Sequence, residues 1–377
     1  MNIKRIVSVM IPVVIAAGLY ATDYTTQTGG GIKKITLDNQ SIRQITCEGK
    51  NLNASVIGTK NKAIELYFSK KSMTEDQLRS AELKADENSK PDAKVTIINK
   101  ELKIGLEKKS GDGEYLTIFT PANVSVIVTL DNGDLNVKDI KGELLLNGKN
   151  MDTDISRVSG VINYRSKSGD LNVEDFEGVL DIRTFSGDIN LKKITGSVKA
   201  DNKSGEFDLS GFNGKLSGSF QVGDVKISSS TVTWVDIVNQ SGEVKISDLK
   251  GDRIKVKSSL GGIDISNSKL DMINVELNAG DLEISGSEAD LNLEVNMGEI
   301  ELSNHRIAGK TDSDIKVSFG DIEVGLKDPA SYDYYVSVND EKADYKSGMD
   351  FDSDIRICNK NKKCLRISKS MGSITVK

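Results

Sequence analysis

The sequence contains very little histidine, cysteine, proline and aromatic side chain. Among its 377 residues are one histidine, three cysteines, four prolines and 5% aromatics. A Ser-His-Asp or Cys-His catalytic arrangement would have to use His305, and one histidine with scattered cysteines makes a metal centre hard to assemble. His305 lies in the irregular stretch LSNHRIAGKTDSD, where we expect a solvated loop. Aromatic residues normally fill thick cores, so their scarcity indicates a thin one.

Neither an excess of positive charge nor a long internal hydrophobic run is present. The net charge is −6, which argues against nucleic acid as a partner. At the N-terminus, Lys4 and Arg5 precede an apolar run from Ile6 to Leu19, and Leu19-Tyr20-Ala21 resembles a cleavage site. A run of about 14 residues is short for a membrane span, so we predict a secretory signal peptide over residues 1–21. An uncleaved anchor is the alternative.

Glycine, by contrast, is abundant and periodic, with 34 copies. One series recurs every 18 or 19 residues from Gly169 to Gly298, with Met151 in the place before Gly169. A second series follows the first at a distance of nine residues: Gly142, Gly160, Gly178, Gly196, Gly214 and Gly251. Internal repeats of this kind indicate a stacked architecture. The members of the first series are Gly133, Gly169, Gly187, Gly205, Gly223, Gly242, Gly261, Gly280, Gly298 and Gly320.

The apolar residues between the glycines predict short strands. The pattern is Gly-x-φ-x-φ-x-x-φ-x, where φ is apolar, as in Leu171, Val173 and Phe176. The alternation is the period of a strand, and the two-residue gap before the third apolar residue predicts a bend. Glycine supplies the backbone freedom of a tight corner. Stacking such turns about 4.8 Å apart pairs each backbone with its neighbours and makes each apolar position an interior ladder.

We therefore predict an all-β, single-domain fold, a single-stranded parallel β-solenoid or β-helix, right-handed, with about 18 to 19 residues per coil. Residues 22–120 are expected to form an irregular N-terminal β cap with a polar helical insertion near 72–90. Residues 121–326 would form the regular solenoid, and residues 327–377 a C-terminal β cap. Calcium-binding nonapeptide rolls are excluded because G-G-x-G-x-D never occurs.

The insertion contains a helix candidate, from Ser72 to Ala85. Ser72 and Glu75 have the spacing of a capping box. Because its surroundings are polar, we expect a solvated insertion in preference to a partner-binding helix.

Two of the three cysteines flank a loop. Cys358 and Cys364 enclose NKNKK between two alternating segments, so they would face each other in a hairpin. An exported protein permits a disulfide there, and two unpaired thiols are the alternative. Cys47 would then remain alone as a small buried hydrophobe.

A carboxylate follows almost every glycine of the first series, so in a solenoid these side chains would form one acidic column. Like charges on adjacent strands repel, so lysines, salt or cations should screen them. Two interpretations stay open, ordinary solvated turns and a ridge that binds divalent cations or a basic partner. The column consists of Asp134, Asp170, Asp188, Glu206, Asp224, Glu243, Asp281, Glu299 and Asp321.

The repeat resembles that of a known family. The segment IFTPANVSVIVTLDNGDLNV, the recurring SGDLNV, SGDINL and SGEVKI, and the closing MGSITVK resemble the bacterial putative-adhesin family of β-strand-repeat proteins, a domain family of unknown function. The likeness spans roughly residues 100–377. It implies an exported, envelope-associated β-solenoid located in the periplasm, on the cell surface or outside the cell. It brings no catalytic residues.

We expect a non-catalytic, adhesin-like binding module whose partner is a surface or envelope protein or glycan. A periplasmic stress-sensing or scaffold protein is one alternative. A β-helix polysaccharide-active enzyme is another, but such enzymes cluster Asp, Lys and Arg in a groove with aromatic subsites. Here the carboxylates recur evenly, and the single tryptophan, Trp234, is expected to fill the core or a corner. We predict no cofactor, catalytic residue or metal ligand.

Overall fold

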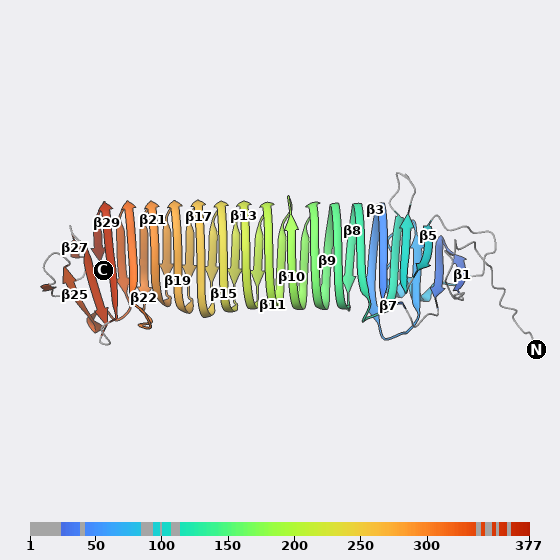
Figure 1. The fold of residues 1–377 in the computed structure, drawn as a ribbon, viewed down its shortest axis with the longest axis horizontal. Coiled ribbons are helices and arrows are strands. Elements are labelled where there is room, and N and C mark those ends of the chain that lie inside the picture. The colour runs from blue at the N-terminus through green and yellow to red at the C-terminus, as the bar shows by residue number, and fades with distance from the viewer. Residues whose placement is uncertain are drawn as a thin grey trace, which may run out of the picture. The chain divides into compact units, whose positions relative to one another are not determined.

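The computed structural model describes residues 24–37, 42–83, 93–98, 100–106, 114–336, 341–343, 349–351, 354–359 and 363–377. The predicted signal peptide lies outside these residues. The chain divides into two compact units, Met1–Gly187 (unit 1) and Asp188–Lys377 (unit 2). Both are built almost entirely of strands (Figure 1).

The coils of unit 1 are long strands stacked in parallel. β8 pairs in parallel with β3 on one side and with β9 on the other, and β9 pairs in parallel with β10. Neighbours in the stack are 18 residues apart, as in the pair Leu171 and Thr153. The predicted parallel β-solenoid is therefore confirmed in this unit. The strands are β3 (Gln44–Thr59), β8 (Ser125–Lys138), β9 (Lys141–Ser168) and β10 (Leu171–Thr184).

Antiparallel strands lie beside this stack in unit 1. β1 pairs with β2, β2 with β4 and β4 with β7, each antiparallel. β5 and β6 form a further antiparallel pair, and both β6 and β7 run parallel to β3. The paired strands are β1 (Tyr24–Gly29), β2 (Ile32–Leu37), β4 (Ile64–Ser69), β5 (Ala93–Ile98), β6 (Glu101–Leu106) and β7 (Glu114–Pro121).

One short helix, α1 (Glu75–Ser80), follows β4. Its cap is Thr74, whose hydroxyl accepts the backbone N–H of Gln77 (3.3 Å), while the Gln77 side chain accepts the N–H of Thr74 (2.8 Å). The predicted capping box at Ser72 and Glu75 is wrong, because the box is displaced by two residues. It still satisfies two donors that a helix start leaves free.

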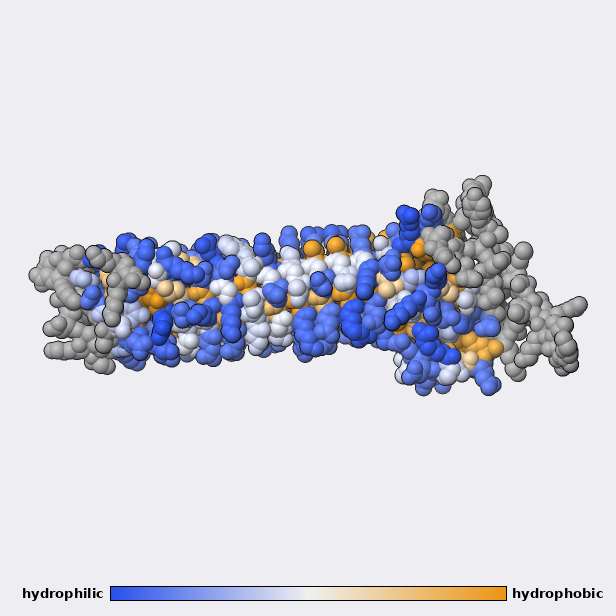
Figure 2. Space-filling model, turned by 90° about the horizontal axis from the view of Figure 1, so that it is seen from below, coloured by the Kyte–Doolittle hydropathy of each residue, from blue (hydrophilic) through white to orange (hydrophobic). Residues whose placement is uncertain are grey.

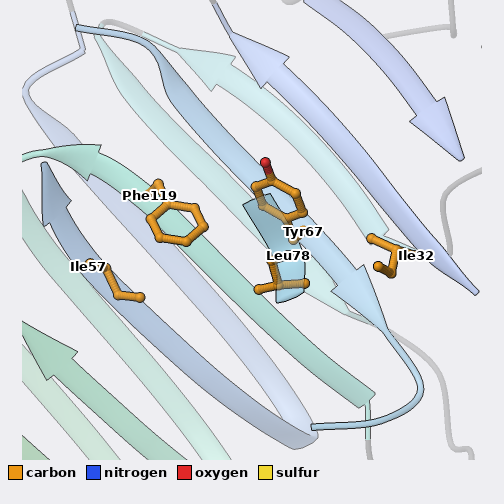
Figure 3. Packing of buried hydrophobic residues seen from close by; sticks show 5 residues of the cluster. All are labelled: Ile32, Ile57, Tyr67, Leu78 and Phe119. Atoms are coloured by element: carbon orange, nitrogen blue, oxygen red, sulfur yellow. The ribbon is translucent and has the colours of Figure 1, made fainter. Parts of the chain in front are cut away.

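The helix is also not a solvated insertion. Leu78 is buried and packs with Ile32, Ile57, Tyr67 and Phe119, drawn in Figure 3. The rings of Tyr67 and Phe119 meet edge to face with centroids 5.5 Å apart. The prediction of a solvated insertion failed because of a single apolar side chain, Leu78, whose burial was not expected from its polar surroundings in the sequence. Burying it fixes α1 over the outer face of β3 and β7.

Unit 2 repeats one short and one long strand per coil. β11 (Ile189–Ser204) opens the unit, and each later strand pairs in parallel with the next of its kind, for example β14 with β16 and β15 with β17. The short strands are β12 (Phe207–Ser210), β14 (Val225–Ser228), β16 (Val244–Ser247), β18 (Ile263–Ser266), β20 (Leu282–Ser285), β22 (Ile300–His305) and β24 (Ile322–Leu326). The long ones are β13 (Asn213–Val222), β15 (Thr231–Ser241), β17 (Lys250–Leu260), β19 (Lys269–Ala279), β21 (Glu288–Met297) and β23 (Ser313–Phe319).

Smaller strands cover the last coil of unit 2. β29 pairs in parallel with β23, and β30 with β24. β28 joins β29 to β25, and β26 and β27 pair with β25 and β30, all antiparallel. These elements are η1 (Pro329–Ser331), β25 (Tyr332–Val336), β26 (Glu341–Ala343), β27 (Met349–Phe351), β28 (Ile355–Asn359), β29 (Cys364–Met371) and β30 (Ile374–Val376).

The cores are ladders of mostly aliphatic side chains. In unit 2, Phe207, Val225, Val244, Ile263 and Leu282 occupy successive coils in register, and all are buried. The residues between them along each strand point outward and are polar. Figure 2 accordingly shows mostly hydrophilic residues on the face it draws, with hydrophobic ones between them. One layer of aliphatic ladders explains why few aromatic residues are needed.

Each coil turns at two positions where the backbone has a positive φ, and these positions stack into two columns. All ten glycines of the first series have positive φ, between 105° and 145°. In the predicted two-residue gap, a second column adopts left-handed conformation with φ of 49° to 59° at non-glycine residues. The predicted bend there is confirmed. Asn and Asp tolerate this conformation best among side-chain-bearing residues. The column contains Asp139, Arg157, Asp175, Lys193, Ser229, Asp248, Asn267 and Asn304.

Candidate functional site

The acidic column of unit 2 holds its coils together. In four coils the aspartate that follows the corner glycine accepts a backbone N–H from the next coil. The N–H of Glu206 donates to Asp188 (2.8 Å), and that of Glu243 donates to Asp224 (2.8 Å). The N–H of Glu299 likewise donates to Asp281 (3.0 Å). These aspartates are short acceptors that satisfy donors at the corner, where the regular strand ladder is interrupted.

At the end of the column, Asp321 accepts two hydrogen bonds from one residue. Its Oδ1 accepts both the backbone N–H (2.6 Å) and the hydroxyl (2.7 Å) of Ser373. These two hydrogen bonds hold the pKa of Asp321 below its usual range. Lysines partly screen the glutamates of the column, as predicted for like charges. Lys245 Nζ lies 2.8 Å from Glu243 Oε2, and Lys226 Nζ lies 3.4 Å from Glu206 Oε2.

Unit 1 uses the same device with two acceptors. The N–H of Asp170 donates to Asp152 (2.9 Å), and the N–H of Asp134 donates to the side-chain oxygen of Asn53 (2.9 Å). The amide of Asn53 shows that an uncharged oxygen can occupy the acceptor position. Burial raises the pKa of Asp134, and the neighbouring carboxylates of Asp152 and Asp154 raise it further.

These hydrogen bonds give four of the nine carboxylates of the column, Asp188, Asp224, Asp281 and Asp321, a structural role that involves no cation. Among the described residues, no group of three or more His, Cys, Asp or Glu side chains is arranged to hold a metal ion. The structural role was missed in the sequence because the column was treated as side chains facing solvent. Its acceptor geometry depends on the backbone of the next coil, which a single repeat does not display.

The expectation of a solvated loop at His305 is wrong. His305 ends strand β22 and is fully buried, with Nε2 3.0 Å from the carbonyl oxygen of Ala289. Burial lowers the pKa of His305 to about 4, so the ring is neutral at pH 7. The extra residues of this coil are instead held by buried Asp290, which accepts the N–H of Gly309 (2.6 Å) and of Lys310 (2.8 Å).

The expectation that Trp234 fills the core or a corner is also wrong. Its side chain is 38% exposed, and the Arg253 guanidinium lies 5.7 Å from the ring centroid. The 19-residue coil inserts one residue, because Gly214 pairs with Val232 whereas Lys215 pairs with Trp234. This bulge turns the indole to the outer face, where Trp234 is in register with Lys215 and Arg253.

The cysteines carry no reactive thiol at the surface. Cys358 and Cys364 are joined in a disulfide that closes the hairpin of β28 and β29, where the two residues face each other. Cys47 is completely buried in β3, and burial raises the pKa of its thiol to about 12. A thiol with so high a pKa is a poor nucleophile.

A groove that sequence reasoning did not find lies in unit 1, between α1 and the outer face of the sheet. Its volume is about 520 Å³, and Met73, Thr74, Glu75 and Leu78 form one wall. A shallower extension of about 140 Å³ continues over the neighbouring strands and shares Met73 with it. Because buried Leu78 holds α1 against the sheet, the wall of the groove that α1 forms is held in place.

The floor of this groove follows from strand alternation. Val56 and Ile118 are buried in the core, so their neighbours Ser55 and Thr117 face outward. Ser55 is in register with Thr117 on β7 and with Asn136 on β8. Asn136 is in turn in register with Asp154 on β9. We call these four residues, Thr117, Ser55, Asn136 and Asp154, the polar row.

The ends of the groove add further groups. Tyr115 and Asp134 line the extension, and Lys138 and Glu75 form an ion pair beside the main groove. Hydroxyl, amide and carboxylate groups are therefore held on adjacent strands. Such a surface can exchange several hydrogen bonds with a polar ligand at once. Alternating polar residues in strands such as YLTIF are too common for the sequence alone to reveal the row.

Comparisons with known proteins place the chain in a family. The family model described as Toastrack DUF4097 matches residues 11–222 and 213–377. One similar solved structure is "Putative lipid binding protein" from Parabacteroides distasonis, with 14% identity and a TM-score of 0.28, covering 74% of this chain and 97% of the other. Another is "a putative cell adhesion protein" from Clostridium sporogenes, with 13% identity and a TM-score of 0.22, covering 52% and 98%.

No curated protein matches the chain. Within the described residues, no helix has both the length and the apolar character needed to cross a membrane. The two family matches together extend from residue 11 to the last residue. The chain therefore belongs to the Toastrack DUF4097 family.

Proposed function

We propose that the protein is a non-catalytic, exported binding module of the cell envelope or cell surface, adhesin-like in role, that binds a carbohydrate in the groove of unit 1. The observation that carries this proposal is the polar row beneath α1. Sugars present many hydroxyl groups, and a row of Thr117, Ser55, Asn136 and Asp154 offers donors and acceptors in register to meet them. Tyr115 in the extension offers a ring against which a sugar can pack.

The rigidity of the site supports binding in preference to turnover. Ser55, Thr117 and Asn136 stand on paired strands, so little conformational entropy is lost when a ligand binds. Four of the nine evenly distributed carboxylates of the acidic column serve as acceptors of backbone N–H groups. A polysaccharide-active enzyme remains the alternative that the experiment must address.

The binding proposal is tested with the mature protein on a glycan array. Positive glycans are then titrated against the Asn136→Leu variant, which removes an amide and fills the groove, and against Ser217→Ala on the outer face of β13 as control. We expect Asn136→Leu to weaken binding at least tenfold and Ser217→Ala to leave it unchanged. Mass spectrometry of the bound glycans should find them intact. Cleaved glycans, or equal binding by all three proteins, would contradict the proposal.

Export is tested separately in cells. Fractionation should find the protein outside the cytoplasm with a mature N-terminus near residue 22, as a cleaved signal peptide requires. Protease added to intact cells distinguishes a surface adhesin, which it digests, from a periplasmic scaffold, which it spares. Cytoplasmic retention of the full-length chain would overturn the exported role.

A further inference from the structure

Unit 2 carries exposed apolar side chains at one repeated position. The residue immediately before the corner glycine is Val222, Leu260, Met297, Phe319 or Met371 in five coils, and each is between 52% and 61% exposed. The interior ladders of the same coils are already filled by buried aliphatic residues. These five side chains therefore contribute nothing to the core.

The five residues lie on one line of strand register, together with Ser241 and Ala279. Strand register pairs Val222 with Ser241, Ser241 with Leu260, Leu260 with Ala279 and Ala279 with Met297. Met297 then pairs with Phe319, and Phe319 with Met371. At about 4.8 Å per coil, seven coils span roughly 29 Å. We call this line, Val222, Ser241, Leu260, Ala279, Met297, Phe319 and Met371, the apolar stripe.

The fold does not require apolar residues at this position. In unit 1 the corresponding residues are Asn132, Asn150, Ser168 and Ser186. There the Asn150 amide donates to the Asn132 side-chain oxygen (2.7 Å), and the Ser168 hydroxyl donates to that of Asn150. A polar ladder thus satisfies the same corner. Large exposed apolar side chains gathered along one line, with Met297, Phe319 and Met371 on successive coils, mark an interaction site more often than a bare surface.

The charge beside the apolar stripe is one-sided. Two residues after five of the seven stripe positions stands a member of the acidic column, namely Asp224, Glu243, Asp281, Glu299 or Asp321. Gly262 and Ser373 stand there after Leu260 and Met371. Immediately before each of the seven stripe positions the side chain is uncharged and polar: Gln221, Gln240, Ser259, Asn278, Asn296, Ser318 and Ser370. A complementary partner must therefore present apolar groups with positive charge along one flank. An anionic lipid surface would be repelled.

The distance between successive side chains of the stripe indicates which secondary structure a partner would present to it. One α-helical turn advances about 5.4 Å, close to the distance of about 4.8 Å between coils. An extended strand places side chains of one face about 6.8 Å apart, which loses register with the coils within two steps. An amphipathic helix lying along the stripe can therefore place one apolar side chain near each coil.

We propose that the apolar stripe of unit 2 is a docking site for an amphipathic helix of a partner protein, whose apolar face packs on the stripe and whose lysines or arginines face the acidic column. This surface is separate from the groove of unit 1 and does not depend on carbohydrate binding. It resembles the general mode in which an apolar helix face meets a complementary surface.

The probe is a labelled model peptide of about 18 residues with leucine on one helical face and lysine on the other. The matched peptide replaces every lysine by glutamate. Fluorescence anisotropy measures binding to the full chain and to the triple variant Leu260→Asn, Met297→Asn and Phe319→Asn. The control variant, Val161→Asn with Val179→Asn, removes two exposed apolar residues that pair in register in unit 1.

We expect the leucine-lysine peptide to bind at least tenfold more tightly than the leucine-glutamate peptide, and binding to weaken with salt. The triple variant should lose at least tenfold, whereas the control variant should bind as the wild type does. Because all the substituted residues are exposed, unchanged melting temperatures should show that the variants fold. Equal binding of the peptide to wild type and triple variant would overturn the proposal.

The same variants test two other occupants of the stripe, a second copy of the chain and a lipid surface. Light scattering that finds a dimer in the wild type and a monomer in the triple variant would assign the stripe to a second copy of the chain and overturn the proposal. So would binding to phosphatidylcholine–phosphatidylglycerol vesicles that the triple variant loses. None of these outcomes bears on carbohydrate binding by the groove, so the two proposals fail independently.

Discussion

Glycine is required at the corners of unit 2 for two separate reasons. The backbone at Gly261 has φ of 119°, which L-residues rarely adopt. In addition, a Cβ built there would lie 2.3 Å from the carbonyl oxygen of Gly242 in the preceding coil. The first reason is local strain, and the second is the close stacking of neighbouring coils. Together they make the glycine column the most sensitive part of the repeat.

The adjacent residue gives a matched test of this argument. Gly261→Ala should lower the free energy of unfolding by roughly 2 to 4 kcal/mol, since it adds both strain and a backbone collision. Gly262→Ala should change it by less than about 1 kcal/mol, because its Cβ would meet only a carbonyl oxygen at 3.6 Å and its φ is not positive. Urea unfolding monitored by circular dichroism compares the two. Equal stability of both variants would contradict the corner assignment.

At the scale of the element, each coil is fastened to the next through the side chain after the corner. Asp188, Asp224 and Asp281 each accept one backbone N–H from the following coil. Aspartate suits this role because its carboxylate is one bond from Cβ and reaches the donor directly. Where glutamate stands instead, as at Glu206 and Glu243, a lysine lies nearby. The column is thus a structural device as well as a source of negative charge.

The two possible roles of the acidic column, acceptor of backbone N–H groups and binder of cations, predict different effects of substitution on stability. Replacing Asp188, Asp224 and Asp281 by Asn keeps an acceptor oxygen and removes charge, so stability should stay level or rise slightly at low salt. Replacing them by Ala removes the acceptors and should cost about 1 kcal/mol per site. Thermal melts with chelator and with millimolar calcium measure both effects. A calcium-dependent rise in the wild type that the Asn variant lacks would show cation binding instead.

Regular features of the repeat were predictable from the sequence, whereas departures from it were not. The corner glycines and the bend in the two-residue gap follow from periods that local chemistry repeats in every coil. His305 was misplaced because it was considered apart from the repeat. It follows Asn304, a member of the left-handed column, and so occupies the position of buried Ser268 and Ser287. Trp234 was misplaced because one inserted residue reverses which face a side chain points to.

The candidate surfaces were less predictable than the fold. The groove of unit 1 depends on where α1 packs over β3, and a single buried residue, Leu78, decides that. The apolar stripe, by contrast, is visible in the sequence once the glycines are aligned, in residues such as Leu260 and Phe319. It was overlooked because an apolar residue near a corner resembles one more core position. Only its exposure distinguishes it from the interior ladders.

At the scale of the whole molecule, a stack of strands must end somewhere, and an uncovered last coil exposes unpaired backbone groups. In unit 2, β29 and β30 continue the stack beyond β23 and β24. β28 then pairs antiparallel with β29, and β27 with β30. The parallel repeat therefore ends in strands of opposite direction and shorter length. Interruption of this kind is how native sheets limit edge-to-edge association.

Removing these covering strands should expose an edge that pairs with other copies of the protein. Deleting residues 327–377 uncovers the edges of β23 and β24 while leaving the coils before them intact. We expect the truncated protein to form oligomers whose size rises with concentration, because each exposed edge can pair with another copy. Light scattering and thioflavin fluorescence measure this association. The control, Cys358→Ser with Cys364→Ser, removes the disulfide but keeps the covering strands and should stay at the wild-type size. A truncated protein that remains monomeric at all concentrations would show that the last coil needs no cover.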